Sequence, residues 1–190
     1  GSGGMGDVYR AHDGQLDRVV AIKTLPPHVA RDPDLKSRFA HEGQMLATLS
    51  PPHICPVFVV GQHHHIDFIV MEFLEGETLT DRIARGRLPT DQALRYGVEI
   101  AGALDKAHRH GVVHRDLKPE NVVVVETGSG SLRARLLDFG IAKLDDDEQL
   151  TTDGQTVGSA AFCAPEQIDR PTEVDGRADL YAFGCILYEA

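Results

Sequence analysis

The 190-residue chain is poor in features that define several protein classes. Its three cysteines, Cys55, Cys163 and Cys185, are far apart and form no CxxC pair. Neither a disulfide framework nor a zinc site is therefore expected, and a reducing compartment fits best. No apolar run reaches the roughly 18 residues of a membrane helix, and the start lacks the basic and apolar regions of a signal peptide. We therefore expect a cytoplasmic chain with no membrane segment, and membrane anchoring of the full-length protein stays open.

Basic residues are also scarce. The 19 lysines and arginines face 29 acidic residues, and the formal net charge is −10. Non-specific nucleic-acid binding needs clustered Lys and Arg, so no nucleic-acid partner is expected. An anionic nucleotide would need local help from a metal and lysines. The sequence also lacks a starting Met, which we interpret as a sign of a fragment.

The order of expected elements predicts an α+β protein with two lobes, residues 1–74 and 75–190. Strands dominate the front, and β-branched residues mark the one at 18–23. Further strands are expected at 57–60 and 68–73, and a hairpin joins 122–125 to 132–137. Helices are expected at 33–49, from about 90 to Gly111, and from about Ala178. The second helix should carry four apolar residues on one face: Leu94, Val98, Ala101 and Leu104.

The first six residues fit the pattern G-x-G-x-x-G. Glycine lacks a Cβ, so its backbone N–H groups can approach phosphate oxygens closely. A Rossmann turn has the same letters, but a helix should follow its last glycine. Here a second β-like run follows instead, which favours a strand–loop–strand hairpin that covers phosphates.

A lysine, Lys23, ends the apolar strand at 18–23. A lone lysine there is most often an exposed side chain that reaches to water. The alternative is that Lys23 binds phosphate and pairs with Glu42 on the following helix. The position of Glu42 fits a solvent-exposed helix residue as well as it fits a partner of Lys23.

The strongest chemical signal is the segment from His114 to Asn121, followed by Asp138. A lone Asp in a loop is usually a turn former, but Asp116 has Lys118 and Asn121 close behind it. These groups suit phosphoryl transfer from a magnesium nucleotide to a hydroxyl. Asp116 would accept the hydroxyl proton and Lys118 would neutralise charge on the transferred group. Asn121 and Asp138, at the two ends of one hairpin, carry the hard oxygen ligands that magnesium takes.

These motifs occur in the order Gly1 to Val8, Val20 to Lys23, Glu42, His114 to Asn121, Asp138 to Gly140, and Ala164 to Glu166. Together they resemble the protein kinase family over nearly the whole chain. Lys118, two residues after Asp116, is typical of the serine/threonine class. The phrases at 4–9 and 39–42 are similar to bacterial eukaryotic-like kinases. The resemblance implies a bilobal protein-kinase-like fold with a β-rich N-lobe and a helical C-lobe, truncated at both ends.

The resemblance also implies how ATP and Mg²⁺ are held between the lobes. Lys23, paired with Glu42, would bind the α- and β-phosphates, and Met71 would be the gatekeeper. The backbones of Glu72 and Leu74 would bond the adenine. Further contacts are implied for the glycine-rich segment and for three apolar side chains, namely Gly1, Ser2, Gly3, Gly4, Met5, Gly6, Val8, Ala21 and Val123.

Two internal supports are implied as well. His114, Phe139 and Leu46 would stack in a spine that marks the active state. Asp179 would brace the catalytic loop from below.

The implied function is transfer of phosphate from ATP to serine or threonine hydroxyls of protein substrates. Arg115 beside Asp116 suggests control by autophosphorylation of the activation loop, at Thr151 or Thr152, with a dimer of kinase domains as a possible arrangement. A pseudokinase scaffold that only binds nucleotide is one alternative, and a small-molecule phosphotransferase is another. Intact Lys23 and Asp116 argue against the first, and the segment 164–166 argues against the second.

Some positions depart from the family pattern. Ser159 and Phe162 replace the usual Thr and Tyr, which affects substrate docking rather than chemistry. At the end of the chain, Glu166 would lack its usual arginine partner. An apolar face of the last helix would be exposed through Leu180, Phe183 and Leu187, so we expect the 190 residues alone to be an unstable, inactive fragment.

Overall fold

The computed structural model describes residues 2–3, 6–25, 30, 32–49, 52–139, 161–169 and 174–190. The described residues belong to two compact units. One unit contains residues up to 49 together with 55–74, and the other contains 52–54, 75–139, 161–169 and 174–190. Several predictions lie outside the described residues: those for Gly1, Gly4, Met5, Gly140, the loop 144–157 with its threonines, and Ser159.

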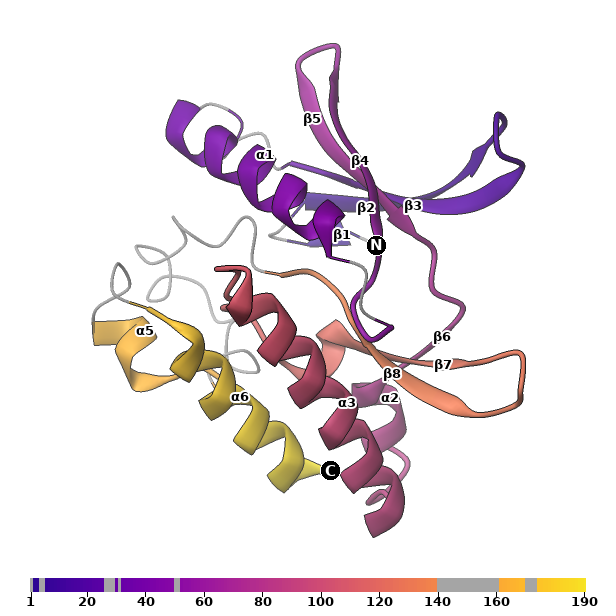
Figure 1. Ribbon diagram of the computed structural model, residues 1–190, viewed down its shortest axis with the longest axis vertical. Helices are drawn as coiled ribbons and strands as arrows, with labels where there is room; N and C mark the ends of the chain where they lie inside the picture. The colour runs from indigo at the N-terminus through magenta and orange to yellow at the C-terminus, as the bar shows by residue number, and fades with distance from the viewer. Residues whose placement is uncertain are drawn as a thin grey trace. The chain divides into compact units, whose positions relative to one another are not determined.

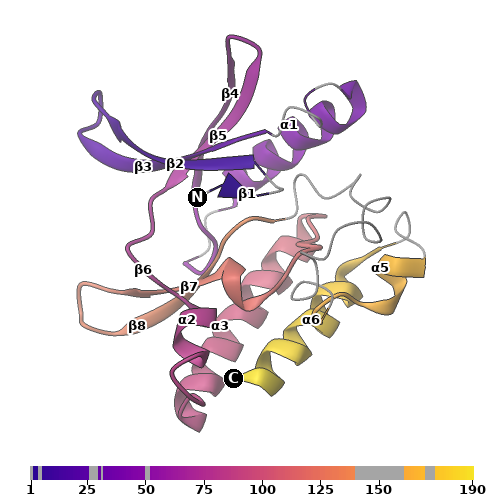
Figure 2. The ribbon, with the colours of Figure 1, turned by 180° about the vertical axis from the view of Figure 1, so that it is seen from behind.

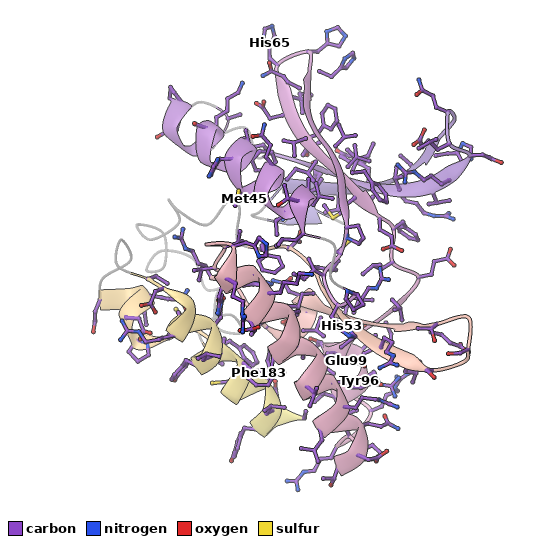
Figure 3. The ribbon with its side chains drawn as sticks, viewed as in Figure 1. Met45, His53, His65, Tyr96, Glu99 and Phe183 are labelled. Carbon is purple, nitrogen blue, oxygen red and sulfur yellow. The ribbon has the colours of Figure 1, made fainter. Side chains whose placement is uncertain are left out.

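The first unit is built on an antiparallel sheet with the strand order β1-β2-β3-β5-β4 (Figure 1). Its strands are β1 (Ser2–Gly3), β2 (Gly6–Asp13), β3 (Arg18–Thr24), β4 (Val57–His63) and β5 (Ile66–Glu72). Asp13 closes the turn between β2 and β3, because its Oδ1 accepts hydrogen bonds from the backbone N–H groups of Gln15 and Leu16. The strands predicted at 18–23, 57–60 and 68–73 are confirmed. Three consecutive histidines lie where β4 meets β5: His63 ends β4, and His64 and His65, the latter labelled in Figure 3, form the exposed turn.

The helix predicted at 33–49 is confirmed as α1 (Pro33–Thr48), and it packs on this sheet. Its Phe39 and Leu46 are buried, and Lys36 Nζ lies 3.1 Å from the Asp67 carboxylate of β5. Gly43 allows the helix to approach closely, because a Cβ there would lie 2.8 Å from Val60 Cγ2 and 3.2 Å from Ile69 Cδ1.

The second unit combines a small sheet with helices (Figure 2). The sheet has the order β6-β7-β8, with β6 (Gly76–Thr78), β7 (Val122–Glu126) and β8 (Leu132–Leu136). The helices are α2 (Leu79–Ile83), α3 (Thr90–Arg109), the 3-10 turn η2 (Pro119–Asn121), α5 (Pro165–Asp169) and α6 (Gly176–Glu189). The predicted β7–β8 hairpin and the predicted helix ends are confirmed, with Gly111 at φ +75 just past α3.

The predicted apolar face of α3 is wrong for two of its four residues. Leu94 and Val98 are 64% and 73% exposed, whereas Leu104 is buried. The buried face instead contains Tyr96, Gly97, Glu99, Ile100, Ala103, Leu104 and Ala107. The spacing of apolar residues predicted the wrong face because the buried face includes a glycine and a carboxylate. Each of these two residues is buried by a contact with one particular neighbour and not because it is hydrophobic.

That glycine lies at one of the contacts between α3 and α6. A Cβ on Gly97 would lie 3.0 Å from Leu187 Cδ2 and 3.8 Å from Phe183 Cζ. Phe183 is therefore half-buried against α3, contrary to the prediction that it is exposed, while Leu180 and Leu187 are exposed as expected. Among the described residues, no helix is both long and apolar enough to cross a membrane.

Candidate active site

The backbone from His114 to Asp116 is held by side chains from distant segments. Asp179 of α6, only 1% exposed, accepts the N–H of His114 at Oδ2 and that of Arg115 at Oδ1, both at 2.8 Å. The predicted brace is therefore confirmed. A contact that the sequence did not suggest adds to it, because His108 Nε2 of α3 lies 2.7 Å from the same Oδ2.

The His114 ring supplies the third anchor of this loop. Its Nε2–H donates to the carbonyl of Leu137 at 2.9 Å, and its Nδ1 accepts the N–H of Asp116 at 3.4 Å. These bonds require the neutral imidazole. Burial lowers the pKa of His114, against the opposing pull of Asp179 and Asp116. The ring also lies against Phe139, with centroids 4.6 Å apart, so two members of the predicted spine are in contact. The part of the spine that involves Leu46 stays a prediction.

The three candidate catalytic residues meet at one carboxylate oxygen. Lys118 Nζ lies 3.2 Å from Asp116 Oδ2, and Asn121 Nδ2 lies 3.1 Å from the same atom. Asn121 Nδ2 also donates to the Asp116 carbonyl at 2.7 Å. The turn η2 makes this possible, because it folds Asn121 back onto Lys118 through an N–H···O bond of 2.9 Å.

The two candidate magnesium ligands lie at the two ends of the β7–β8 hairpin. Asn121 directly precedes β7, Asp138 lies just beyond β8, and the N–H of Leu137 donates to the Asn121 carbonyl at 2.8 Å. The side-chain N–H groups of Asn121 donate to Asp116, so Oδ1 of the same amide can bind a cation. An amide oxygen and a carboxylate form a donor set of hard oxygens, so these residues fit a magnesium ion.

In the first unit, Lys23 is 5% exposed, so it is not the exposed lysine of the simpler interpretation. It lies opposite Val8 on β2 and Ile69 on β5. The side chain of Glu42 lies outside the described residues, and its pairing with Lys23 therefore stays a prediction.

The glycine-rich segment forms a hairpin rather than a strand–helix turn. Strands β1 and β2 pair antiparallel, with Ser2 opposite Asp7 and Gly3 opposite Gly6. The predicted strand–loop–strand arrangement is confirmed, while contacts of this segment with phosphate stay predictions.

The other candidate nucleotide contacts differ in burial. Ala21 and Met71 are buried and lie opposite each other in the sheet, and Val123 is buried in β7 of the second unit. Val8 is 37% exposed and Leu74 is half-buried. The N–H of Glu72 already donates to the Pro56 carbonyl at 3.0 Å, so a bond from Glu72 to adenine would have to use its carbonyl.

Sequence reasoning missed Glu99, a buried carboxylate of α3 that supports the strand leading to Asp138 (Figure 3). It accepts the N–H of Ala134 and a bond from Arg133 Nη1, both at 2.7 Å. His53 binds the same strand, because its Nδ1 donates to the Ala134 carbonyl at 3.1 Å and its carbonyl accepts the N–H of Leu136. A charged residue inside an otherwise apolar helix face was the only available signal.

The comparison with known proteins agrees with this geometry. All residues, 1–190, match the protein kinase domain. The chain belongs to the protein kinase family. It is 41% identical, over its whole length, to a probable serine/threonine-protein kinase of Streptomyces coelicolor. It is 39% identical over 99% of its length to the serine/threonine-protein kinase PknJ of Mycobacterium tuberculosis.

The solved structures give the same family and fold. The crystal structure of the Mycobacterium tuberculosis PknI kinase domain is 34% identical, with a TM-score of 0.78 over 98% of this chain and 69% of that one. The predicted family and fold are confirmed. The kinase chain spans only 28% of the Streptomyces relative and 32% of PknJ. The family is that of serine/threonine protein kinases, which typically depend on ATP and Mg²⁺.

Proposed function

We propose that this kinase chain transfers the γ-phosphoryl group of ATP to serine or threonine hydroxyls of protein substrates. The observation that carries the proposal is the convergence of Lys118 and Asn121 on Asp116, on a loop whose backbone is fixed by Asp179. Such fixed positioning is what phosphoryl transfer requires, because catalysis there is mainly orientation and electrostatic stabilisation.

In the proposed mechanism, Asp116 orients the acceptor hydroxyl and takes its proton while the hydroxyl oxygen bonds to the γ-phosphorus. The bond from that phosphorus to the β–γ bridging oxygen breaks, and ADP leaves with the electron pair. Lys118 offsets the charge on the transferred group. Asn121 and Asp138 would hold magnesium, which when bound neutralises charge on the phosphate oxygens.

We assign nucleotide contacts as the family pattern implies. Lys23, supported by Glu42, would bind phosphate, and Met71 would be the gatekeeper of the adenine site. The remaining assigned contacts are Gly1, Ser2, Gly3, Gly4, Met5, Gly6, Val8, Ala21, Glu72, Leu74 and Val123.

We also propose that the chain divides into an N-lobe at residues 1–74 and a C-lobe at residues 75–190.

We further propose that the kinase is regulated by phosphorylation of Thr151 or Thr152 by a second copy. The support is Arg115, which directly follows His114 on the loop held by Asp179. An arginine can bind a phosphate through two N–H bonds. A nucleotide-binding scaffold without turnover is the second candidate. It is disfavoured because Lys23, Asp116, Asn121 and Asp138 are all present.

The decisive experiment is the variant Asp116→Asn in the intact protein. The amide cannot accept the proton, so transfer to a serine- or threonine-containing peptide library should fall by about a thousandfold or more, within the range expected for loss of an acid–base group and a charge. Binding of ATP, measured by calorimetry, should change by less than about threefold. A variant that keeps wild-type turnover would refute the assigned role, and a wild type that binds ATP but never transfers phosphate would favour the scaffold.

A further inference from the structure

A glutamine outside the kinase motifs connects two segments that are far apart in sequence. Gln167 of α5 donates from Nε2 to the carbonyl of Arg115 at 2.7 Å. Its Oε1 accepts the N–H of Ala164 at 3.1 Å, and its own N–H donates to the Ala164 carbonyl at 2.9 Å. One side chain thus joins the start of α5 to the residue before Asp116.

The Arg115 end of this connection is conformationally strained. Arg115 has φ +61, a left-handed conformation that costs a non-glycine residue about 1–2 kcal/mol. Asp179 holds the N–H of Arg115, and Gln167 holds its carbonyl. Both peptide planes that flank the strained residue are therefore fixed by side chains, and the second plane is the one that leads into Asp116.

Part of this geometry has an ordinary structural explanation. At the third position of α5, Gln167 caps the N–H of Ala164, as a glutamine or glutamate does in a capping box. That explanation accounts for Oε1 but not for Nε2. The bond to Arg115 spans 52 residues of sequence and contributes nothing to the helix cap.

We propose that Gln167 is a positioning residue, which couples the segment 161–166 in front of α5 to the orientation of Asp116. The proposal rests on the proposed function, in which Asp116 receives the hydroxyl proton. A displacement of the segment at 161–166 would release the Arg115 carbonyl, relax its left-handed conformation and rotate Asp116 away from the acceptor. Activity would then depend on the position of α5 relative to Arg115, although Gln167 makes no contact with the substrate.

Two variants separate the two halves of this side chain. Gln167→Glu keeps the oxygen that caps α5, a position where glutamate is favourable, but replaces the donor to Arg115 by a second acceptor. Gln167→Lys keeps a donor for the Arg115 carbonyl and loses the cap. Gln15→Glu, at an exposed turn of the first unit, makes the same charge change elsewhere and serves as the control.

The measurements are steady-state kinetics of the intact protein on a degenerate peptide library with a fixed serine or threonine, thermal unfolding, and amide hydrogen exchange. Gln167→Glu should lower kcat about tenfold, the effect of one lost hydrogen bond and a new repulsion, with the KM for ATP unchanged and a smaller loss of Tm than Gln167→Lys. Exchange in the peptide around 112–117 should become faster in that variant. Gln167→Lys should keep kcat within about threefold despite a lower Tm, and Gln15→Glu should match the wild type.

The opposite pattern would overturn the proposal. If Gln167→Glu has wild-type kcat and exchange, while Gln167→Lys loses activity in step with its Tm, the side chain is only a helix cap. Failure of the proposed function looks different: the wild type itself transfers no phosphate, and the exchange of the catalytic loop still reports whether Gln167 positions it.

Discussion

At the scale of single residues, the backbone of the loop that carries Asp116 is held by side chains that accept its N–H groups. The N–H groups of His114 and Arg115 are bound by Asp179, and that of Asp116 is bound by the His114 ring. The bonds of His114 and Asp116 are buried and that of Arg115 is partly buried, so losing a buried partner would leave an unsatisfied polar group and cost about 1–3 kcal/mol. The reactive carboxylate is thus placed by its neighbours along the backbone.

The neutral state of His114 predicts how stability depends on pH. Burial lowers the pKa of His114 below its ordinary value of about 6.5, so the unfolded chain binds the proton more readily than the folded one. Stability therefore rises with pH and is lost as the pH falls below about 6.5, by up to roughly 1.4 kcal/mol per pH unit. His114→Gln never titrates but loses the contacts of the ring, so its free energy of unfolding in urea should differ from that of the wild type by a constant amount above that pH, and the difference should change with pH only below it. Parallel curves would contradict the prediction.

At the scale of elements, the unit built on β1 to β5 depends on the close approach of α1 to the sheet at Gly43. Alanine there gains up to about 1 kcal/mol of helix propensity, but its Cβ would overlap the stiff side chain of Val60. Overlap should win, and Gly43→Ala should destabilise the protein by about 1–2 kcal/mol in denaturant unfolding.

Gly102 offers a matched comparison. It also lies inside a helix, but nothing lies within 4 Å of a Cβ added there. Gly102→Ala should therefore be stabilising, by up to about 1 kcal/mol. Equal effects of the two substitutions would show that Gly43 is not a packing requirement.

At the scale of the whole molecule, local patterns and long-range contacts differ in what the sequence reveals. The strands, the hairpin around 126–131 and the end of α3 at Gly111 follow from local propensity and turn chemistry, and they were predicted. The roles of His108 and Gln167 were not, because each acts on a partner 71 and 52 residues away. The buried face of α3 was also not predicted. Gly97 packs against α6 and Glu99 bonds to β8, and neither contact can be inferred from the spacing of apolar residues.

Regulation is likewise a property of whole molecules, because the proposed phosphorylation takes place between two copies. Intact protein incubated with ATP and Mg²⁺ should carry phosphate on Thr151 or Thr152, with an initial rate that rises with the square of the protein concentration. Peptide mapping by mass spectrometry measures both the sites and the rate. An Asp116→Asn protein incubated alone is the control and should stay unmodified. Absence of phosphate from both threonines in active wild type would refute the regulatory proposal.

The contact between Gly176 and His108 has a consequence for how this chain can evolve. A Cβ on Gly176 would lie 2.7 Å from His108 Nδ1, while the other nitrogen of that ring lies against Asp179. A side chain at 176 would push the ring away from the carboxylate, and a bulkier ring substitute at 108 would press on α6. Positions 108, 176 and 179 therefore constrain one another. The effects of substitutions at these three positions should therefore be non-additive, and the three positions should change together in evolution.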